Sequence, residues 1–299
     1  ALAGPLHFFL LYRVVKMYWP GAYMGWLPLS CAVPMVACLW GLVRLFPEGH
    51  VRRNTVLALF GGAALFFLTL VFPIQFDKQW LTLGWALEGM ALCWLFHRVP
   101  HVGLRLVGVG LLGVVLLRLG VNPAVIDYYP REGLVILNWY LYTYGVAAAC
   151  MFGAAWLLTP PRDRLGGVSV PPFLQGAGTA LLFLLVNLEI SHFFTREGGR
   201  VRLFDFGGLF ARDLSYTVAW ALFALVLVVV GLVRRLAPAR YAGLGLLGLT
   251  LLKLFFHDLA SLAQLYRVSA LAGVAVVAIV ASFLYQKYLS ASDGKGGGQ

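Results

Sequence analysis

The chain has 299 residues, of which 61% are hydrophobic and 12% are charged, and its formal net charge is +11. A soluble domain carries roughly twice this charged fraction, so the composition excludes an ordinary soluble protein and predicts an integral membrane protein. The positive charge does not indicate nucleic-acid binding, because no basic cluster accompanies a soluble fold. Basic loops beside anionic lipid head groups account for it.

Apolar runs long enough to cross a bilayer as helices recur along the whole chain. A span needs about 20 mostly apolar residues, because each backbone amide must be paired inside its own helix there. Ten such runs are centred near residues 8, 35, 65, 88, 112, 147, 182, 224, 248 and 275. The first is the weakest, since it contains Arg13 and Lys16. The pattern predicts an all-α integral membrane protein with about ten transmembrane helices.

Two segments of the chain repeat each other. Residues 82–119 align without gaps on residues 217–254, at an offset of 135 residues and with 14 of 38 positions identical. Trp85 recurs as Trp220, and Arg118 has the cation Lys253 as its counterpart. Each segment holds two apolar helices, so the repeat predicts a bundle made of repeated helical hairpins. Function is expected where the two copies differ.

Each copy contains a GxGxxG run, with glycines at 108, 110 and 113 and at 243, 245 and 248. These runs lie inside apolar helices with no strand before them, so they are not a dinucleotide-binding fingerprint. Small residues in such helices let neighbouring helices approach closely. We expect that role for these glycines.

Glu88 lies near the middle of a predicted span, where its counterpart in the repeat is Phe223. An ionisable side chain inside a bilayer costs about 2.5–3.5 kcal/mol on insertion scales, so it requires a reason. One interpretation is a buried proton acceptor or substrate contact. The other is a carboxyl group that bonds to a neighbouring helix and serves packing alone.

Glu189 and His192 are three residues apart and share a helix face. Di-metal bundles use this spacing, but they need a second Glu-x-x-His segment, and the sequence has none. We therefore predict no metal site and no cofactor, and we interpret the pair as a polar cluster near the outer end of its helix.

The segment KLFFHDLASLAQLYR gathers Lys253, His257, Asp258 and Arg267 near the end of one span and the start of the next. Lys253 has two interpretations: a long side chain that extends to the interface, or one wall of a site for an anionic substrate, with Arg118 as its equivalent. Asp258 either caps the connecting turn or pairs with Arg267.

Basic residues divide almost equally between the two membrane faces. Short, purely basic turns such as VRR at 51–53 and the basic stretch at 234–240 favour one face as cytoplasmic, and the long loop 195–213 belongs to the other. We therefore predict a cytoplasmic C-terminus. The membrane domain is expected to cover residues 1–288, followed by a disordered cytoplasmic tail at 289–299.

Two stretches carry a family resemblance: PIQFDKQWLTLGWALEGMALCW from Pro73, and KLFFHDLASLAQLYRVSALAGVAVVAIVASFLYQKY from Lys253. With WALEG, D-L-x-x-L-x-x-L-Y-R and the terminal Y-Q-K, the chain resembles the C-terminal portion of the large bacterial membrane proteins grouped as domain of unknown function 2339 (DUF2339). The resemblance implies a multi-pass protein of the bacterial inner membrane and a chain that continues before Ala1. It implies no activity.

Three classes of function follow from these residues. The first is an enzyme or binding protein for a lipid-linked or glycan substrate at the periplasmic face. The second is a proton-coupled transporter, and the third is a scaffold subunit with a periplasmic or membrane protein partner. Membrane lipids are expected partners in every case. The candidate catalytic residues are Glu88, His192, His257 and Asp258, and the candidate substrate contacts are Lys253, Arg267, Glu189, Arg118 and Trp85.

Overall fold

The computed structural model describes residues 3–19, 24–46, 52–75, 78–126, 137–204, 206, 209–258 and 264–293. Within these ranges it does not describe the side chains of 3–6, 72–73, 78–79, 264–270 and 288–293. Arg267, one of the predicted substrate contacts, therefore belongs to a described helix, but its side chain lies outside the described residues.

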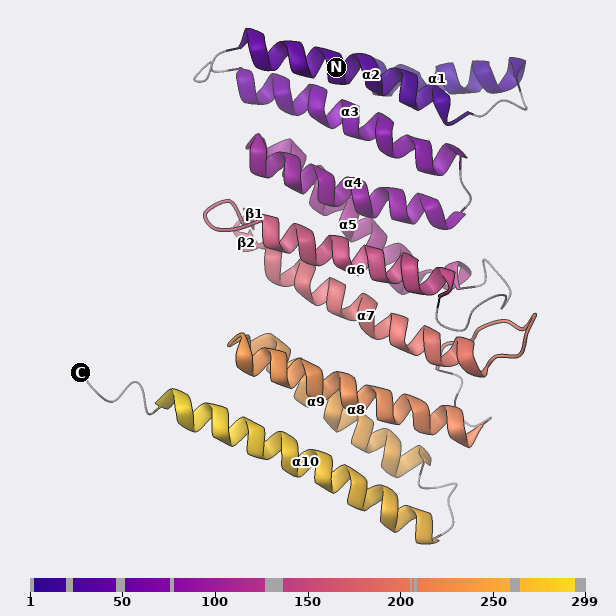
Figure 1. Ribbon diagram of the computed structural model, residues 1–299, viewed down its shortest axis with the longest axis vertical. Coiled ribbons are helices and arrows are strands. Elements are labelled where there is room, and N and C mark those ends of the chain that lie inside the picture. The colour runs from indigo at the N-terminus through magenta and orange to yellow at the C-terminus, as the bar shows by residue number, and fades with distance from the viewer. Residues whose placement is uncertain are drawn as a thin grey trace. The chain divides into compact units, whose positions relative to one another are not determined.

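The described residues form ten α-helices, as the sequence predicted (Figure 1). Their bounds are α1 Ala3–Tyr18, α2 Trp26–Leu45, α3 Arg53–Gln75, α4 Lys78–Arg98, α5 Val102–Val121, α6 Trp139–Leu157, α7 Val170–Phe194, α8 Phe210–Val233, α9 Ala237–Lys253 and α10 Gln264–Asp293. A short 3₁₀ turn, η1 (Pro123–Val125), follows α5, and a π-helical turn, η2 (Leu254–Asp258), continues α9.

Seven helices of the described chain are long and apolar enough to cross a membrane: α2, α3, α5, α6, α7, α8 and α9 with η2. Helix α4 has sufficient length, but Glu88 and a last turn with His97 and Arg98 make it more polar. The chain is therefore an integral, multi-pass membrane protein, and its helices pack largely as antiparallel neighbours.

The chain divides into two compact units. The first contains residues 1–189 and 195–201, and the second contains residues 190–194 and 202–299. In the first unit, α2 packs on α3, α3 on α4, and α4 on both α5 and α6. Phe8, Ala32 and Phe67 form a buried core between α1, α2 and α3. In the second unit, α8 packs against α9 and α10.

The repeated segments form two equivalent hairpins, α4/α5 and α8/α9. In the first, a Cβ added to Gly108 would lie 2.9 Å from the carbonyl oxygen of Gly89. In the second, a Cβ added to Gly243 would lie 2.8 Å from the carbonyl oxygen of Ala224. These positions correspond at the 135-residue offset, so both hairpins cross at the same place.

The other four glycines of the GxGxxG runs do not form this contact. Nothing in the described structure lies within 4 Å of a Cβ added to Gly110, Gly113, Gly245 or Gly248. Close approach of helices therefore accounts for the first glycine of each run, and the expectation does not extend to the other two.

A small β-hairpin separates α6 from α7, which the sequence analysis did not predict. Strand β1 (Arg164–Leu165) pairs antiparallel with β2 (Val168–Ser169). The turn between them uses Gly166 and Gly167, whose φ angles of 56° and 87° suit glycine. The nearby Arg105 Nη1 donates to the carbonyl oxygen of Arg162 at 2.7 Å, which fastens this loop to α5.

We expect Gly108→Leu to lower the free energy of unfolding by about 1–3 kcal/mol, because the new side chain forces α4 and α5 apart. Gly110→Leu is the matched control, since it lies in the same run and a Cβ there meets nothing within 4 Å. Denaturant unfolding of the purified full chain in detergent, followed by circular dichroism, measures both. An equal loss of stability in the two variants would contradict this account of the crossing.

Candidate functional site

A buried ion pair lies where α8 meets the end of α9. The ammonium group of Lys253 donates to Asp258 Oδ1 at 2.8 Å, to Thr217 Oγ1 at 2.8 Å and to the backbone oxygen of Asp213 at 2.9 Å. An ammonium group has three donors, so these contacts use its full capacity. The side chains of Lys253 and Asp258 are 8% and 1% exposed. The cation is therefore buried and compensated, and it does not extend to the interface.

Thr217 links the two charged groups. Its hydroxyl accepts from Lys253 and donates to Asp258 Oδ2. Thr217 is 5% exposed and Asp258 is 2% exposed, so the triad lies inside the protein. A buried ion pair is maintained only when its remaining polar atoms are also hydrogen-bonded, and Thr217 provides those bonds.

The π-helical turn η2 makes this pair geometrically possible. Lys253 and Asp258 are five residues apart, and in an α-helix two such side chains would point in directions about 140° apart. A π-helix, with its i→i+5 hydrogen bonds, brings residues five apart close to one face, and such turns are frequent at functional sites. The widened turn therefore points both side chains toward α8.

His257 lies at the edge of the same cluster. Its Nε2 is 3.4 Å from Asp213 Oδ2, and its side chain is 39% exposed, whereas that of Asp213 is 8% exposed. Phe206 covers the cluster, with its ring centre 5.6 Å from the His257 ring and 5.1 Å from Lys253 Nζ. The arrangement thus has a buried ionic part and a half-exposed imidazole beside an aromatic ring.

The first hairpin contains the equivalent cation and threonine. Arg118 Nε donates to Thr82 Oγ1 at 2.9 Å, and the guanidinium group lies 5.8 Å from the ring centre of Trp85. Arg118 and Thr82 correspond to Lys253 and Thr217 at the offset of 135 residues. The bond between a basic side chain and a threonine is therefore common to both copies.

The acidic and imidazole groups are specific to the second copy. At the 135-residue offset, Asp213, His257 and Asp258 correspond to Lys78, Asn122 and Pro123. The second hairpin thus has two carboxylates and an imidazole near the shared cation that the first hairpin lacks. The α8/α9 hairpin is therefore the candidate functional site, whereas the bond between Arg118 and Thr82 in the α4/α5 hairpin has a structural role.

A cavity of about 280 Å³ lies beside this network, between α8, α9 and α10. Thr217 forms part of its wall, so the cavity and the ionic network share a residue. The rest of the lining is apolar except for Thr250: Leu214, Val218, Ala221, Leu222, Leu225, Leu247, Leu251, Leu254, Gly273, Val274 and Val277.

The corresponding surface of the first hairpin is filled by α6. The hydroxyl of Tyr144, a residue 1% exposed, donates to the carbonyl oxygen of Leu119 at 2.9 Å. A Cβ added to Gly153 of α6 would lie 2.9 Å from Met90 Sδ. The counterparts of Leu119 and Met90 are Leu254 and Leu225, and both line the cavity. Among the described side chains of α10, those of Gly273, Val274 and Val277 line this space, and they are smaller than Tyr144.

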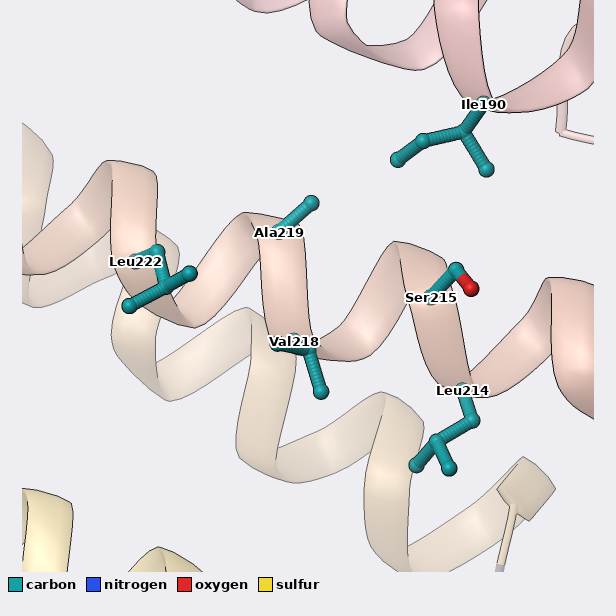
Figure 2. A pocket seen from close by; sticks show the side chains of 6 residues that line it. All are labelled: Ile190, Leu214, Ser215, Val218, Ala219 and Leu222. Atoms are coloured by element: carbon teal, nitrogen blue, oxygen red, sulfur yellow. The ribbon is translucent and has the colours of Figure 1, made fainter. Parts of the chain in front are cut away.

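A second, shallower groove of about 350 Å³ lies along α8 next to the cavity and shares Leu214, Val218 and Leu222 with it (Figure 2). Figure 2 shows Ala219 pointing toward Ile190 of the last turn of α7, whereas Leu214 and Val218 point away from it. This groove contains Ser215 and no charged residue. It therefore offers fewer groups for binding or catalysis than the cavity beside Thr217.

The remaining predicted site residues have other partners. Glu88 is 8% exposed and accepts from the hydroxyl of Thr69 in α3 at 2.8 Å. Glu189 Oε2 accepts from Asn138 Nδ2 at 2.7 Å. His192 is 3% exposed in the last turn of α7. The structure therefore brings together Lys253, His257 and Asp258, and it gives Glu88 and Glu189 separate contacts. Among the described residues, no three His, Cys, Asp or Glu side chains are grouped as a metal site.

Sequence reasoning did not select three residues of the cluster. Thr217 had a visible signal, because it is identical to Thr82 in the repeat. Asp213 precedes Thr217 by one helical turn and shares its face, but nothing in the sequence connected it to His257, 44 residues away. The ring of Phe206 lies 5.1 Å from Lys253 Nζ, and its place in the loop before α8 gives no sign of that contact.

The family described as "Predicted membrane protein (DUF2339)" matches residues 1–196 and 97–288. The chain is a member of the DUF2339 family. The resemblance inferred from WALEG and the Asp258–Arg267 pattern is thereby confirmed, and the two overlapping matches agree with an internal repeat. Neither curated proteins nor solved structures gave a match to the chain.

We expect Asp258→Leu in this DUF2339 chain to lower the free energy of unfolding by about 3–5 kcal/mol, because it leaves the Lys253 cation buried without a counter-ion. Lys253→Met combined with Asp258→Leu removes both charges and should recover most of that loss. Denaturant unfolding of both variants in detergent measures the difference. A double variant as unstable as the single one would show that the pair is not the source of the effect.

Proposed function

We propose that this DUF2339 chain binds a lipid-linked substrate at the α8/α9 hairpin. The apolar chain of the substrate occupies the cavity between α8, α9 and α10, and its polar head lies beside His257 and Phe206. The observation that carries the proposal is the position of Thr217. It lines the cavity and also bonds to Lys253 and Asp258, so an apolar compartment adjoins a polar one within a few ångströms.

The size and lining of the cavity support an apolar chain as its occupant. Ligand pockets measure roughly 300–1,000 Å³ and are mostly apolar with a few placed polar groups. At about 280 Å³ the cavity lies at the lower end of that range, and only Thr217 and Thr250 among its lining residues are polar. It suits one hydrocarbon chain better than a complete two-chain lipid.

The electrostatics of the cluster favour a hydroxyl-bearing head group, such as a glycan. Lys253 is paired with Asp258 at 2.8 Å and has all three donors bonded, so it has little capacity left for a phosphate. Asp213 and His257 can exchange hydrogen bonds with hydroxyl groups. The ring of Phe206 offers an apolar face on which a sugar can stack.

In an enzyme of this kind, His257 would be the residue that accepts or donates a proton. It is within reach of Asp213, which orients the imidazole, and it is the most exposed member of the cluster. Histidine is the side chain most often used for general acid–base catalysis. Asp258, buried against Lys253, would position the network and not touch the substrate.

A proton-coupled transporter is the second candidate. The observation that favours it is the grouping of four ionisable residues: His257 lies 3.4 Å from the Asp213 carboxylate, and Lys253 bonds to the backbone oxygen of Asp213 and to buried Asp258. Chains of ionisable groups inside membranes serve as proton relays in transporters. Substrate-dependent proton uptake into liposomes that contain the full chain, abolished in Asp258→Asn, would favour transport over substrate binding alone.

We expect Gly273→Leu to displace the bound apolar chain, because Gly273 lines the cavity and a Cβ there meets nothing within 4 Å. The full chain is purified in mild detergent, and its co-purifying lipids are extracted and quantified by mass spectrometry. A lipid-linked species should be retained by the wild type and reduced about tenfold or more in the variant, a loss of at least ~1.4 kcal/mol in binding.

Gly245→Leu is the matched control for this experiment. It replaces an open glycine of α9 that does not line the cavity, so lipid retention should equal that of the wild type. Equal retention by Gly273→Leu and the wild type would rule the cavity out as the binding site.

We also propose that the chain lies in the bacterial inner membrane with its C-terminus in the cytoplasm and the His257 cluster at the periplasmic face. The short basic turn at Arg234 and Arg235, between α8 and α9, supports this orientation. A C-terminal green fluorescent protein fusion should fluoresce, and an alkaline phosphatase fusion at the same point should be inactive. The reverse pattern would place the cluster on the cytoplasmic side.

A further inference from the structure

One end of the first unit carries a concentration of arginine. It is formed by the C-terminal ends of α2 and α4, the N-terminal ends of α3 and α5, and the loop before β1. Arg44, Arg52, Arg53, Arg98 and Arg105 lie at these helix ends, and Arg162 and Arg164 lie in the loop and in β1. We call these seven residues the arginine end.

Carboxylates do not balance this charge in the described part of the chain. Asp163 is the acidic residue described there, and it is 9% exposed and accepts from the hydroxyl of Ser169 at 2.9 Å. Arg44, Arg98 and Arg162 are exposed. Even with Glu48, which the sequence places between α2 and α3, seven arginines face two acidic residues, so this end carries an excess of positive charge.

Two residues of the arginine end have a buried donor with no acceptor among the described residues. The Nε atoms of Arg53 and Arg105 are buried and have no hydrogen-bond acceptor among the described residues. A buried charged donor without an acceptor is costly, and an anionic oxygen is the acceptor that repays it best. These Nε atoms are themselves buried, so the groups of the arginine end that a lipid can reach include the exposed Arg44, Arg98 and Arg162.

Exposed tryptophans locate this end at the membrane interface. The guanidinium group of Arg44 lies 3.6 Å from the ring centre of Trp40, and that of Arg98 lies 5.8 Å from the ring centre of Trp94. These indoles are 62% and 48% exposed. Tryptophan prefers the boundary between hydrocarbon and head groups, and a cation stacked on it lies at the level of the lipid phosphates.

We infer that the arginine end is a binding surface for anionic phospholipid head groups, such as phosphatidylglycerol. Guanidinium groups bind phosphate oxygens through two parallel hydrogen bonds. The adjoining indoles contact the upper part of the acyl chains. A surface that combines both features fits a lipid phosphate better than a free phosphate ion, which has no apolar part. This inference does not depend on the cavity beside Thr217.

The test uses the full chain in vesicles of phosphatidylcholine that contain a minor fraction of brominated lipid, which quenches nearby tryptophan. Brominated phosphatidylglycerol should quench the wild type more strongly than brominated phosphatidylcholine at the same fraction. Arg44→Gln with Arg98→Gln should lose this preference. Arg44→Lys with Arg98→Lys should retain part of it, because charge remains but bidentate bonding does not.

Arg234→Gln with Arg235→Gln is the matched control, since it removes two positive charges from the turn after α8. It should keep the preference of the wild type. Inorganic phosphate added to the vesicles should leave quenching unchanged. The inference fails if both brominated lipids quench the wild type equally, if the control loses the preference to the same extent, or if inorganic phosphate abolishes it. Circular dichroism verifies that every variant keeps its helical content.

Discussion

A hydrogen bond from a basic side chain to a threonine joins the two helices of each repeated hairpin at the end opposite their connecting turn. In a bilayer a buried cation is tolerated only when it is paired inside the protein, and both copies meet this requirement with the same pair of positions: Arg118 to Thr82 and Lys253 to Thr217. At the middle of each hairpin, the close contacts of Gly108 and Gly243 set the distance between the helices. The framework is thus fixed at two points, a backbone contact and a polar bond.

The second copy has used this framework differently from the first. Around Lys253 it adds Asp258 and the Asp213–His257 pair, and it widens the end of α9 into the π-helical turn that allows Lys253 to reach Asp258. Beside the same threonine it lacks the bulky residues with which α6 fills the first copy, so a cavity remains. In the second copy, the additional polar groups and the cavity therefore lie next to each other. In the first copy, Tyr144 bonds to the carbonyl oxygen of Leu119, and the counterpart of Leu119 in the second copy, Leu254, lines the cavity.

The cluster around Lys253 and the arginine end differ in how their charges are balanced. The cluster of the second unit compensates its charges internally, which suits recognition of neutral hydroxyl groups by hydrogen bonds. The arginine end of the first unit carries more positive charge than the described carboxylates there can balance, which suits anions supplied by the membrane. The contrast follows from the placement of the acidic residues: Asp213 and Asp258 lie within reach of cations, whereas Asp163 at the arginine end bonds to Ser169.

The sequence by itself determined the membrane class, the positions of ten helices, the hairpin repeat and the family, because hydropathy and helical length depend on local residues. It also selected Lys253, His257 and Asp258, since ionisable side chains stand out in apolar spans. Tertiary structure decided the rest. Asp213 and Thr217 join the cluster only because α8 lies against α9, and only the geometry of η2 brings Asp258 to the ammonium group of Lys253. Likewise, a cavity is the volume left when α10 packs on α8, and that volume depends on three helices together, which no local pattern records.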